Sequence, residues 1–280
     1  MVWRRTLRAT LRRAPNVAVL ALLTVFALGP IVVLGFNALK ERGEIARNPL
    51  GPPQTVTFEN FPRAWDVGNY STTLRNSAVL VLGTVAGILS LGSMAAYSMA
   101  RLRLPGEGIV TLYLLVTASL PIQLFLVPLF YMWRNLGLVN NLFGLILIYI
   151  AIFSPFAIFL MRSYMLNLPG DFEDAARIDG ANEWQVYTRI VLPLCWPSLL
   201  TVGLVVSLTV WNEFLLATVF LTDSSLFTAV TSYYNFSGRF GRDWALTSAG
   251  AVMMILPIIV LFLAFQRRFI AGLTRGGLTG

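Results

Sequence analysis

Carboxylates gather in one short stretch of an otherwise apolar chain, over residues 171–183. Carboxylates at this spacing can bind a positively charged surface through ionic interactions. An amphipathic helix on a lipid surface would instead need a basic polar face, and an anionic leaflet would repel this one. Docking into a basic cleft of another protein is therefore the preferred interpretation, with a helix at the lipid interface as the alternative. The carboxylates are Asp171, Glu173, Asp174, Asp179 and Glu183, and Arg177 is the one basic residue among them.

Residues for catalysis or metal binding are scarce in this chain. It has no histidine, one cysteine (Cys195) and one lysine (Lys40). Zinc sites, haem attachment, serine–histidine catalysis and disulfides each need residues that are missing. A phosphate-binding loop needs glycine before its lysine, whereas Lys40 follows Leu39. We therefore expect a protein that is no enzyme and has no metal site or cofactor, so ATP hydrolysis would have to come from another subunit.

Helix signals surround the carboxylates. The residues Leu-Pro-Gly at 168–170 interrupt the chain, and Asp171 can then cap a helix over about 172–179 with Asp174 in the capping-box position. Gly180 ends that helix. A second short helix is expected from Asn182 to Pro193, with Val186 and Ile190 on one face.

The composition places these short helices beside a membrane. The chain has 280 residues, of which 56% are hydrophobic and 12% charged, and its mean hydropathy is +0.71. Uncharged stretches recur that are long enough to cross the roughly 30 Å hydrocarbon core as helices. We predict an all-α integral membrane protein, one domain over 1–280, with six transmembrane helices. They lie near 17–38, 77–99, 109–132, 142–161, 197–221 and 245–265.

Arginine placement predicts the orientation of the helices. With the N-terminus inside, more of the 21 basic residues fall on the cytoplasmic side than outside, as the positive-inside rule requires. Both termini and the loop 162–196 are then cytoplasmic. The net charge of +8 is assigned to topology and lipid headgroups rather than to nucleic acid. The cytoplasmic segments hold Arg4, Arg5, Arg8, Arg12 and Arg13, then Arg101 and Arg103, then Arg162, Arg177 and Arg189, then Arg267, Arg268 and Arg275.

The acidic segment also carries a spaced motif, D-A-A-x-x-x-G-x(9)-I-x-L-P, from Asp174 to Pro193. At every spacing it resembles the EAA loop of ATP-binding-cassette importer permeases. One departure is Asp174, where the family usually has glutamate; the shorter carboxylate keeps the charge. The stretch 175–181 is similar to the version in carbohydrate-uptake permeases. Residues 134–147, 211–217 and 267–277 are also similar to maltose-type inner-membrane subunits.

The resemblance implies a type I importer permease fold in the cell inner membrane, forming half of a sugar translocation pathway. It implies four kinds of partner: a second permease subunit, two copies of a cytoplasmic ATP-binding subunit, an extracytoplasmic sugar-binding protein and a sugar. The loop would be a coupling helix seated in the ATPase. The coupling residues implied are Glu173, Asp174, Ala175, Ala176, Asp179, Gly180, Ile190, Leu192 and Pro193.

Three polar residues in predicted spans are candidates for the translocation pathway. Glu213 is expected inside the fifth helix, where a charge needs a partner or a water-filled cavity. Two roles stay open for it: lining the cavity or its outer gate, and anchoring helices to one another. Gln123 and Asn212 are equally suited to sugar hydroxyls or to another helix. The prolines in the spans are expected to produce kinks. They are Pro30, Pro121, Pro128, Pro155 and Pro257.

Two other functional classes compete with a permease. An ion-gradient-driven secondary transporter would show internal repeats and several intramembrane ionisable residues, whereas only Glu213 is found here. A membrane scaffold without transport would explain the bundle but not the loop motif. The loop 39–76 is expected to dock the binding protein, and the tail from Arg267 either reaches the ATPase or frays.

Overall fold

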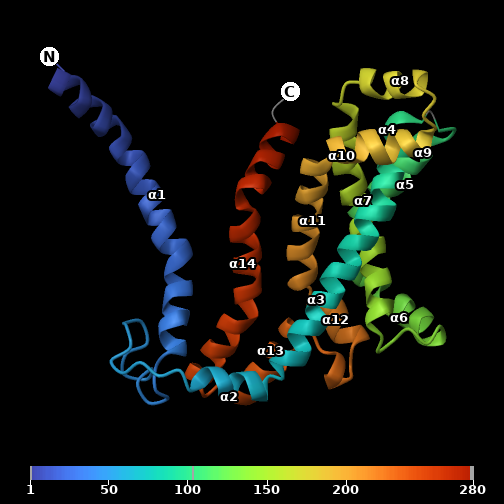
Figure 1. The fold of residues 1–280 in the computed structure, drawn as a ribbon. Coiled ribbons are helices and arrows are strands. Elements are labelled where there is room, and N and C mark those ends of the chain that lie inside the picture. Colours follow the sequence, from blue (N-terminus) through green and yellow to red (C-terminus); the bar gives the residue numbers. More distant parts are fainter. Residues whose placement is uncertain (1, 103, 278–280) are drawn as a thin grey trace. The chain divides into compact units, whose positions relative to one another are not determined.

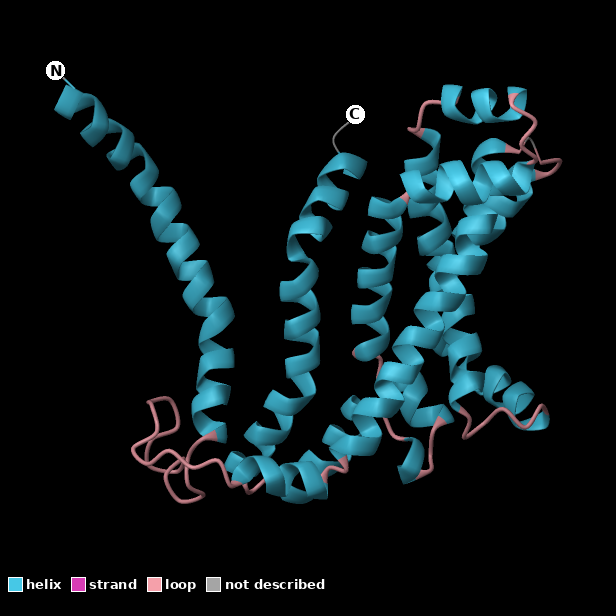
Figure 2. Ribbon diagram, in the orientation of Figure 1, coloured by secondary structure: helices cyan, strands magenta, loops and turns pink. Residues whose placement is uncertain are grey.

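The computed structural model describes residues 2–102 and 104–277, with side chains described over 15–102 and 104–266. Every regular element in these ranges is helical, which confirms the all-α prediction (Figure 1, Figure 2). The arginines predicted at 4–13, 103 and 267–275 lie outside the described side chains. The membrane orientation therefore stays a prediction.

The helices form two compact units. One unit runs to Tyr70 and includes Tyr233–Ile255, and the other comprises Ser71–Ser232 and the chain from Leu256. The long C-terminal helix α14 (Trp244–Gly277) contributes to both units. One permease domain over 1–280 stays a prediction.

Among the described residues, four helices are long and apolar enough to cross a membrane, over Pro15–Ala38, Tyr70–Arg101, Leu142–Leu166 and Trp244–Gln266. The first belongs to α1 (Val2–Ala38) and the third is α7 (Leu142–Leu166). The second is built from α3, a π-helical turn and α4, and the fourth is the apolar part of α14. These spans overlap four of the predicted helices. The bounds of the second are Tyr70–Gly87 for α3, Ile88–Gly92 for η1 and Ser93–Arg101 for α4.

The other two predicted spans are broken helices. The predicted helix 109–132 consists of two helical segments. After α5 (Glu107–Ser119) the chain bends by 91° and continues as η2 (Ile122–Phe125) and α6 (Leu126–Asn135). Pro121 causes this break, because proline has no N–H and disfavours helical backbone in the residue before it. Leu120 accordingly has ψ 127°. The kink predicted at Pro121 is therefore a sharp break between two helices.

The predicted helix 197–221 is also interrupted. Its apolar part is α11 (Trp196–Trp211), and a separate helix, α12 (Leu215–Phe220), follows the break. On its N-terminal side the chain bends by 73° from Glu183–Leu194 into α11. Six spans result only if each bent pair crosses the membrane once.

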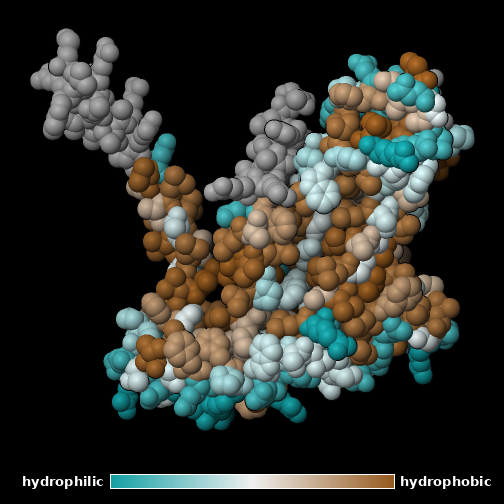
Figure 3. Space-filling view, in the orientation of Figure 1, coloured by the Kyte–Doolittle hydropathy of each residue, from teal (hydrophilic) through white to brown (hydrophobic). Residues whose placement is uncertain are grey.

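In the second unit, α7 is the central helix and packs against α4, α5 and α11. Its buried residues include Tyr149, Met161 and Met165. The short helix α8 lies at one end of this unit, and α6 and α12 lie at the other (Figure 1). Hydrophilic residues gather at both ends, and hydrophobic residues cover the surface between them (Figure 3). This pattern fits a bundle immersed in lipid.

In the first unit, polar side chains hold the loop after α1. The Lys40 ammonium is fully buried and donates to the Asn37 side chain at 2.9 Å and to the Asn48 carbonyl at 2.5 Å. Asn60, at the start of α2 (Asn60–Val67), donates to the carbonyls of Ala38 and Lys40. The one lysine of the chain thus organises this loop.

A glycine on α7 gives a test of this packing. A Cβ at Gly144 would collide with the Leu138 carbonyl oxygen, which is backbone and cannot turn away. We expect Gly144→Ala to destabilise the protein by about 1–3 kcal/mol, the usual cost of overpacking. The thermal unfolding midpoint of the purified protein in detergent measures this.

Gly203 on α11 is the matched control. A Cβ there would meet only ordinary contacts at 3.7 Å with Leu89 and Val85, and alanine favours a helix by about 1 kcal/mol over glycine. Gly203→Ala should therefore preserve or raise the midpoint. Equal midpoints for both variants would contradict the packing of α7 against Leu138.

Candidate functional site

The acidic loop folds into α8 (Asp171–Ile178), within one residue of the predicted 172–179. Its N-cap is Gly170, which has no side chain to cap the helix. The predicted capping by Asp171 was therefore wrong, since Asp171 is the first residue of the helix. Asp171, Glu173 and Asp174 instead occupy the first turn, where negative charge is favoured by the helix dipole.

Gly180 ends α8 with a backbone conformation that only glycine adopts readily. Its φ is +86°. The Gly180 amide donates to the Arg177 carbonyl at 3.1 Å, and the Ala181 amide donates to the Ala176 carbonyl at 2.9 Å. These two bonds form a Schellman motif, which requires the left-handed conformation at this position. The motif therefore has glycine at this position because the backbone adopts a left-handed conformation there.

The second short helix begins where it was predicted. Asn182 and Gln185 form a reciprocal capping box, with both bonds at 2.9 Å. Helical backbone continues through α9 (Glu183–Val186), η3 (Tyr187–Val191) and α10 (Leu192–Leu194). Val186 is fully buried and Ile190 half-buried, so the predicted inner face is confirmed. Leu192 is also half-buried, whereas Pro193 is exposed.

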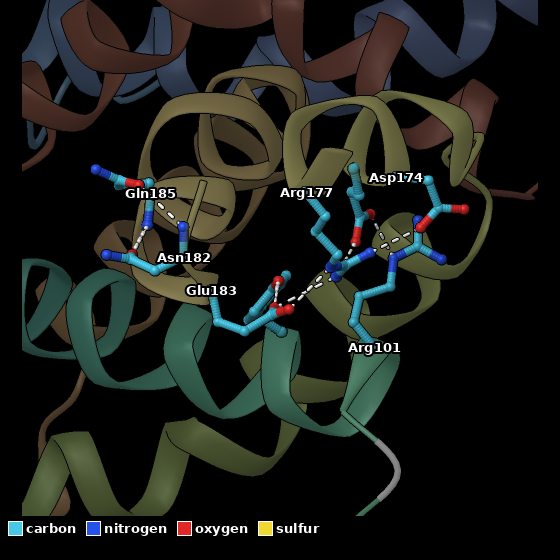
Figure 4. A network of polar contacts seen from close by, with 8 residues as sticks. Arg101, Asp174, Arg177, Asn182, Glu183 and Gln185 are labelled. Carbon is cyan, nitrogen blue, oxygen red and sulfur yellow. Dashed lines mark hydrogen bonds and ion pairs between the residues drawn. The ribbon is translucent and has the colours of Figure 1, made fainter. Parts of the chain in front are cut away.

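Arg177 is the centre of a network that joins α8 to α9 (Figure 4). Its Nε donates to Glu183 Oε1 at 2.8 Å and its Nη1 donates to Asp174 Oδ1 at 2.9 Å. Nη2 lies 3.4 Å from Glu173 Oε2. The hydrogen bonds to Glu183 raise the pKa of the Arg177 guanidinium above its ordinary value. The positive charge therefore stays fixed between three carboxylates.

Glu173 ties α8 to α4. Its side chain is only 5% exposed, and Oε1 lies 2.7 Å from the Nε of Arg101, whose side chain is 16% exposed. Arg101 Nη2 also donates to the Leu168 carbonyl at 2.8 Å, just before α8. A buried charge is costly unless it is paired. This ion pair therefore holds α8 at a defined place on the end of α4.

Sequence reasoning missed two members of this site. Arg101 was assigned only to membrane orientation, and Tyr97 to a membrane span. The Tyr97 hydroxyl donates to Glu183 Oε2 at 2.7 Å. The available signal was the position of Arg101 at the end of its helix, in the same compartment as the acidic loop. Their pairing required the fold, because 72 residues separate Arg101 from Glu173.

The outer face of α8 is free of these internal bonds over most of its length. Ile178 is 87% exposed and Phe172 is 55% exposed. Ala175, Asp179 and Gly180 are exposed as well, and Ala176 packs partly against the core. Asp174 is 71% exposed despite its bond to Arg177. Of the predicted coupling residues on α8, Glu173 therefore faces inward, Ala176 is partly buried, and Asp174 and Ala175 are exposed.

Glu213 does not lie within a helix. It occupies the break between α11 and α12, where its carboxylate accepts from the amides of Leu216 at 2.9 Å and Ala217 at 3.0 Å. The Tyr149 hydroxyl of α7 donates to it at 2.7 Å. The prediction of an intrahelical carboxylate was wrong, because Glu213 caps a new helix and bonds to a neighbouring one.

The other two pathway candidates lie on separate elements. Asn212 is exposed and donates to the Leu208 carbonyl one turn back at 2.7 Å. Gln123 is exposed on η2, just after the Pro121 break. Over the described residues, no cluster of three or more histidine, cysteine or carboxylate side chains is arranged to hold a metal ion.

Comparison with known proteins identifies relatives over nearly the whole chain. The family described as binding-protein-dependent transport system inner membrane component matches residues 88–275. A trehalose transport system permease protein, SugB of Mycobacterium tuberculosis, is 36% identical, with 96% of this chain and 99% of that protein covered. An arabinooligosaccharides transport system permease protein, AraQ of Halalkalibacterium halodurans, is 35% identical, with 94% of each chain covered.

A solved structure has the same fold. It is the crystal structure of a bacterial ABC transporter involved in the import of the acidic polysaccharide alginate. One of its chains superposes with a TM-score of 0.80 at 24% identity, over 93% of this chain and 97% of that one.

The buried ion pair leads to a prediction about α8. Removing one partner of a buried pair costs about 3–5 kcal/mol, since the other charge is left without compensation. We expect Glu173→Ala to release α8 from α4 and to raise hydrogen exchange of the amides at 171–178 at least tenfold, as measured by mass spectrometry.

Asp171→Ala is the matched control, because Asp171 is an exposed carboxylate on the same helix. It should change the exchange rates little. If Glu173→Ala and Asp171→Ala exchange at the same rate as the parent protein, Glu173 does not hold α8 in place.

Proposed function

The chain belongs to the family of binding-protein-dependent transport system inner membrane components, and from this premise we propose that it is a permease subunit of an ATP-driven sugar importer. The full-length relatives named for trehalose and arabinooligosaccharide transport support a carbohydrate cargo. The observation that carries the mechanism is α8, an exposed helix whose inner face is anchored to α4 by a buried ion pair.

The outer face of α8 is the surface for a separate ATPase. Phe172, Ala175 and Ile178 share this exposed face, since residues three apart are neighbours on a helix. Asp174 and Asp179 add negative charge at its sides, so a cleft with a basic rim and an apolar floor would complement it. Ala175 and Gly180 have little or no side chain and permit close approach.

Transmission from the ATPase to the bundle would follow the described contacts. Closure of two ATPase subunits on ATP would draw two such helices together. Because Glu173 bonds to Arg101 and Arg177 bonds to Glu183, α8 would carry α4 and α9 with it. A rigid-body tilt of packed helices would then convert an inward-open pathway to an outward-open one.

The assembly proposed contains this chain, a second permease subunit, two ATP-binding subunits and an extracytoplasmic sugar-binding protein in the inner membrane. The acidic loop and both termini lie on the cytoplasmic side. Exposed Arg42 and Arg63, which flank the buried Asp243 at 3.5 and 3.7 Å, support a binding-protein contact at the loop 39–76.

Within the membrane, Gln123, Asn212 and Glu213 are the proposed pathway residues. The bonds of Glu213 to Tyr149 and to the start of α12 favour a helix anchor near the outer gate. The exposed side chains of Gln123 and Asn212 suit contact with sugar hydroxyls.

The docking surface on α8 can be tested by charge. We expect Ile178→Glu to place a carboxylate on the apolar centre of the contact and to reduce co-purification of the ATPase subunit at least tenfold. Leu136→Glu is the control, because Leu136 is an exposed apolar residue of the same size as Ile178 but follows α6 at the other end of the unit. Equal loss in both variants would indicate general misfolding and would contradict the assigned surface.

A glycine substitution tests coupling itself. Gly180→Trp would add a bulky side chain at a left-handed position on the docking surface. We expect sugar uptake by reconstituted complexes to fall at least tenfold, with loss of ATP hydrolysis stimulated by the binding protein. Uptake that remained coupled to ATP in this variant would exclude the loop as the link.

The energy source separates this proposal from an ion-driven carrier. Vanadate should abolish uptake by proteoliposomes, whereas a protonophore should leave it unchanged. Uptake with the opposite response would favour the ion-driven alternative.

A further inference from the structure

Two arginines join the ends of α4 and α7 reciprocally. Arg101 is the last residue of α4, and its Nη2 donates to the carbonyl of Leu168, two residues beyond the end of α7, at 2.8 Å. Arg162 lies one turn before the end of α7, and its Nε donates to the carbonyl of Met99 in the last turn of α4 at 3.1 Å. Each helix therefore supplies an arginine to the backbone at the end of the other.

Helix dipoles give this exchange of arginines a physical reason. The C-termini of α4 and α7 both lie beside α8 (Figure 1). Each C-terminus carries a partial negative charge, so two such ends side by side repel one another. A guanidinium at each end offsets the repulsion and donates to the carbonyls there. Arg101 and Arg162 therefore stabilise the contact of α4 with α7 at this end.

Each of the two arginines also pairs with a carboxylate on a third helix. Arg101 pairs with Glu173 of α8. Arg162 Nη2 lies 2.5 Å from Oε1 of Glu107, the first residue of α5. The side chains of Arg162 and Glu107 are 27% and 33% exposed, so solvent ions screen their attraction less than that of a fully exposed pair. One carboxylate thus ties α8 to α4, and the other ties α5 to α7.

Together these bonds form a continuous path from the acidic helix to a broken span. They join α8 to α4, α4 to α7, and α7 to α5. α5 then leads to the 91° bend at Pro121. Directly before α5, Gly106 has a φ of +79°, and small loop residues of this kind can absorb backbone rotation. The pair of Arg162 with Glu107 therefore fixes the start of α5 more firmly than the loop before it does.

We propose that Arg162 and Glu107 are positioning residues for coupling, which make α5 move with α7 when an ATPase displaces α8. This inference rests on the proposed function, since α8 must first receive the force. It goes further because it names α5, and with it the span broken at Pro121, as an element that the force reaches. Without the pair, α8, α4 and α7 still move together while α5 lags, so that ATP is hydrolysed with less sugar transported.

Glu107→Ala tests the pair with little disturbance, because it leaves Arg162 bonded to Met99. In complexes reconstituted with their permease, ATPase and binding-protein partners, we expect the sugar transported per ATP hydrolysed to fall at least threefold. Co-purification of the ATPase subunit and hydrolysis without binding protein should stay unchanged. Gly108→Ala is the matched control, because a Cβ at Gly108, in the same turn of α5, would meet nothing within 4 Å. It should leave the ratio unchanged.

A covalent replacement of the pair separates positioning from folding. Cys195 is buried, and Cys195→Ala gives a parent without thiols, in which Glu107→Cys and Arg162→Cys together remove the ion pair and supply two. A bifunctional methanethiosulfonate joins α5 to α7 again and should restore at least half of the parent ratio of sugar to ATP. A monofunctional methanethiosulfonate modifies the same thiols without joining the helices and should restore nothing.

The outcomes separate this inference from the proposed function. Trehalose, diacetylchitobiose and an arabinooligosaccharide, sugars named for the relatives, serve as probes, and an assembled parent complex that takes up none of them contradicts the proposed function. In a parent that transports, an unchanged ratio in Glu107→Ala overturns the role of the pair in coupling. A lowered ratio that the bifunctional reagent does not restore, or that both reagents restore equally, assigns the pair to folding alone and overturns the inference as well.

Discussion

Hydrocarbon cannot form hydrogen bonds with the peptide backbone, and the architecture of this chain follows from that constraint. Four helices satisfy their own backbone groups over lengths sufficient to cross a bilayer. The other two predicted spans are interrupted by Pro121 and by the turn at Asn212–Phe214. Such interruptions create polar groups that need partners, and at the second one the carboxylate of Glu213 accepts from the amides of Leu216 and Ala217.

The same constraint explains where charge is found. Glu213 occupies a helix break and accepts hydrogen bonds from two backbone amides and from the Tyr149 hydroxyl. Its carboxylate therefore satisfies backbone amides at the start of the next helix. At the end of the second unit, Glu173 is buried but paired with Arg101. At the same end, Asp171 and Asp174 are exposed on α8, and Asp179 is exposed directly after it. Charged groups inside the bundle thus anchor one helix to another, whereas the aspartates at its end remain exposed.

Two features of α8 have opposite mechanical roles. Its inner face is held by Glu173 and Arg177, which bond to α4 and α9. Its outer face carries Phe172 and Ile178, which are both exposed. A helix that is held to the bundle on one side and has exposed apolar residues on the other is suited to transmit force between two proteins. In the importer that we propose, this arrangement would couple α8 to a separate ATPase.

The sequence by itself determined the all-α class, the membrane location, the helix at 171–178 and the motif from Asp174 to Pro193, because these depend on local composition and spacing. Tertiary structure decided which carboxylates face outward. Glu173 was grouped with Asp174 by sequence, yet it is buried because its partner, Arg101, comes from a distant helix. The sharp break at Pro121 and the helix neighbours were equally invisible, although Pro121 and Pro155 were recognised as kinks. Only the packing of α5 against α7 brings Thr117 and Ala151 to one cavity, since no sequence pattern records which helices become neighbours.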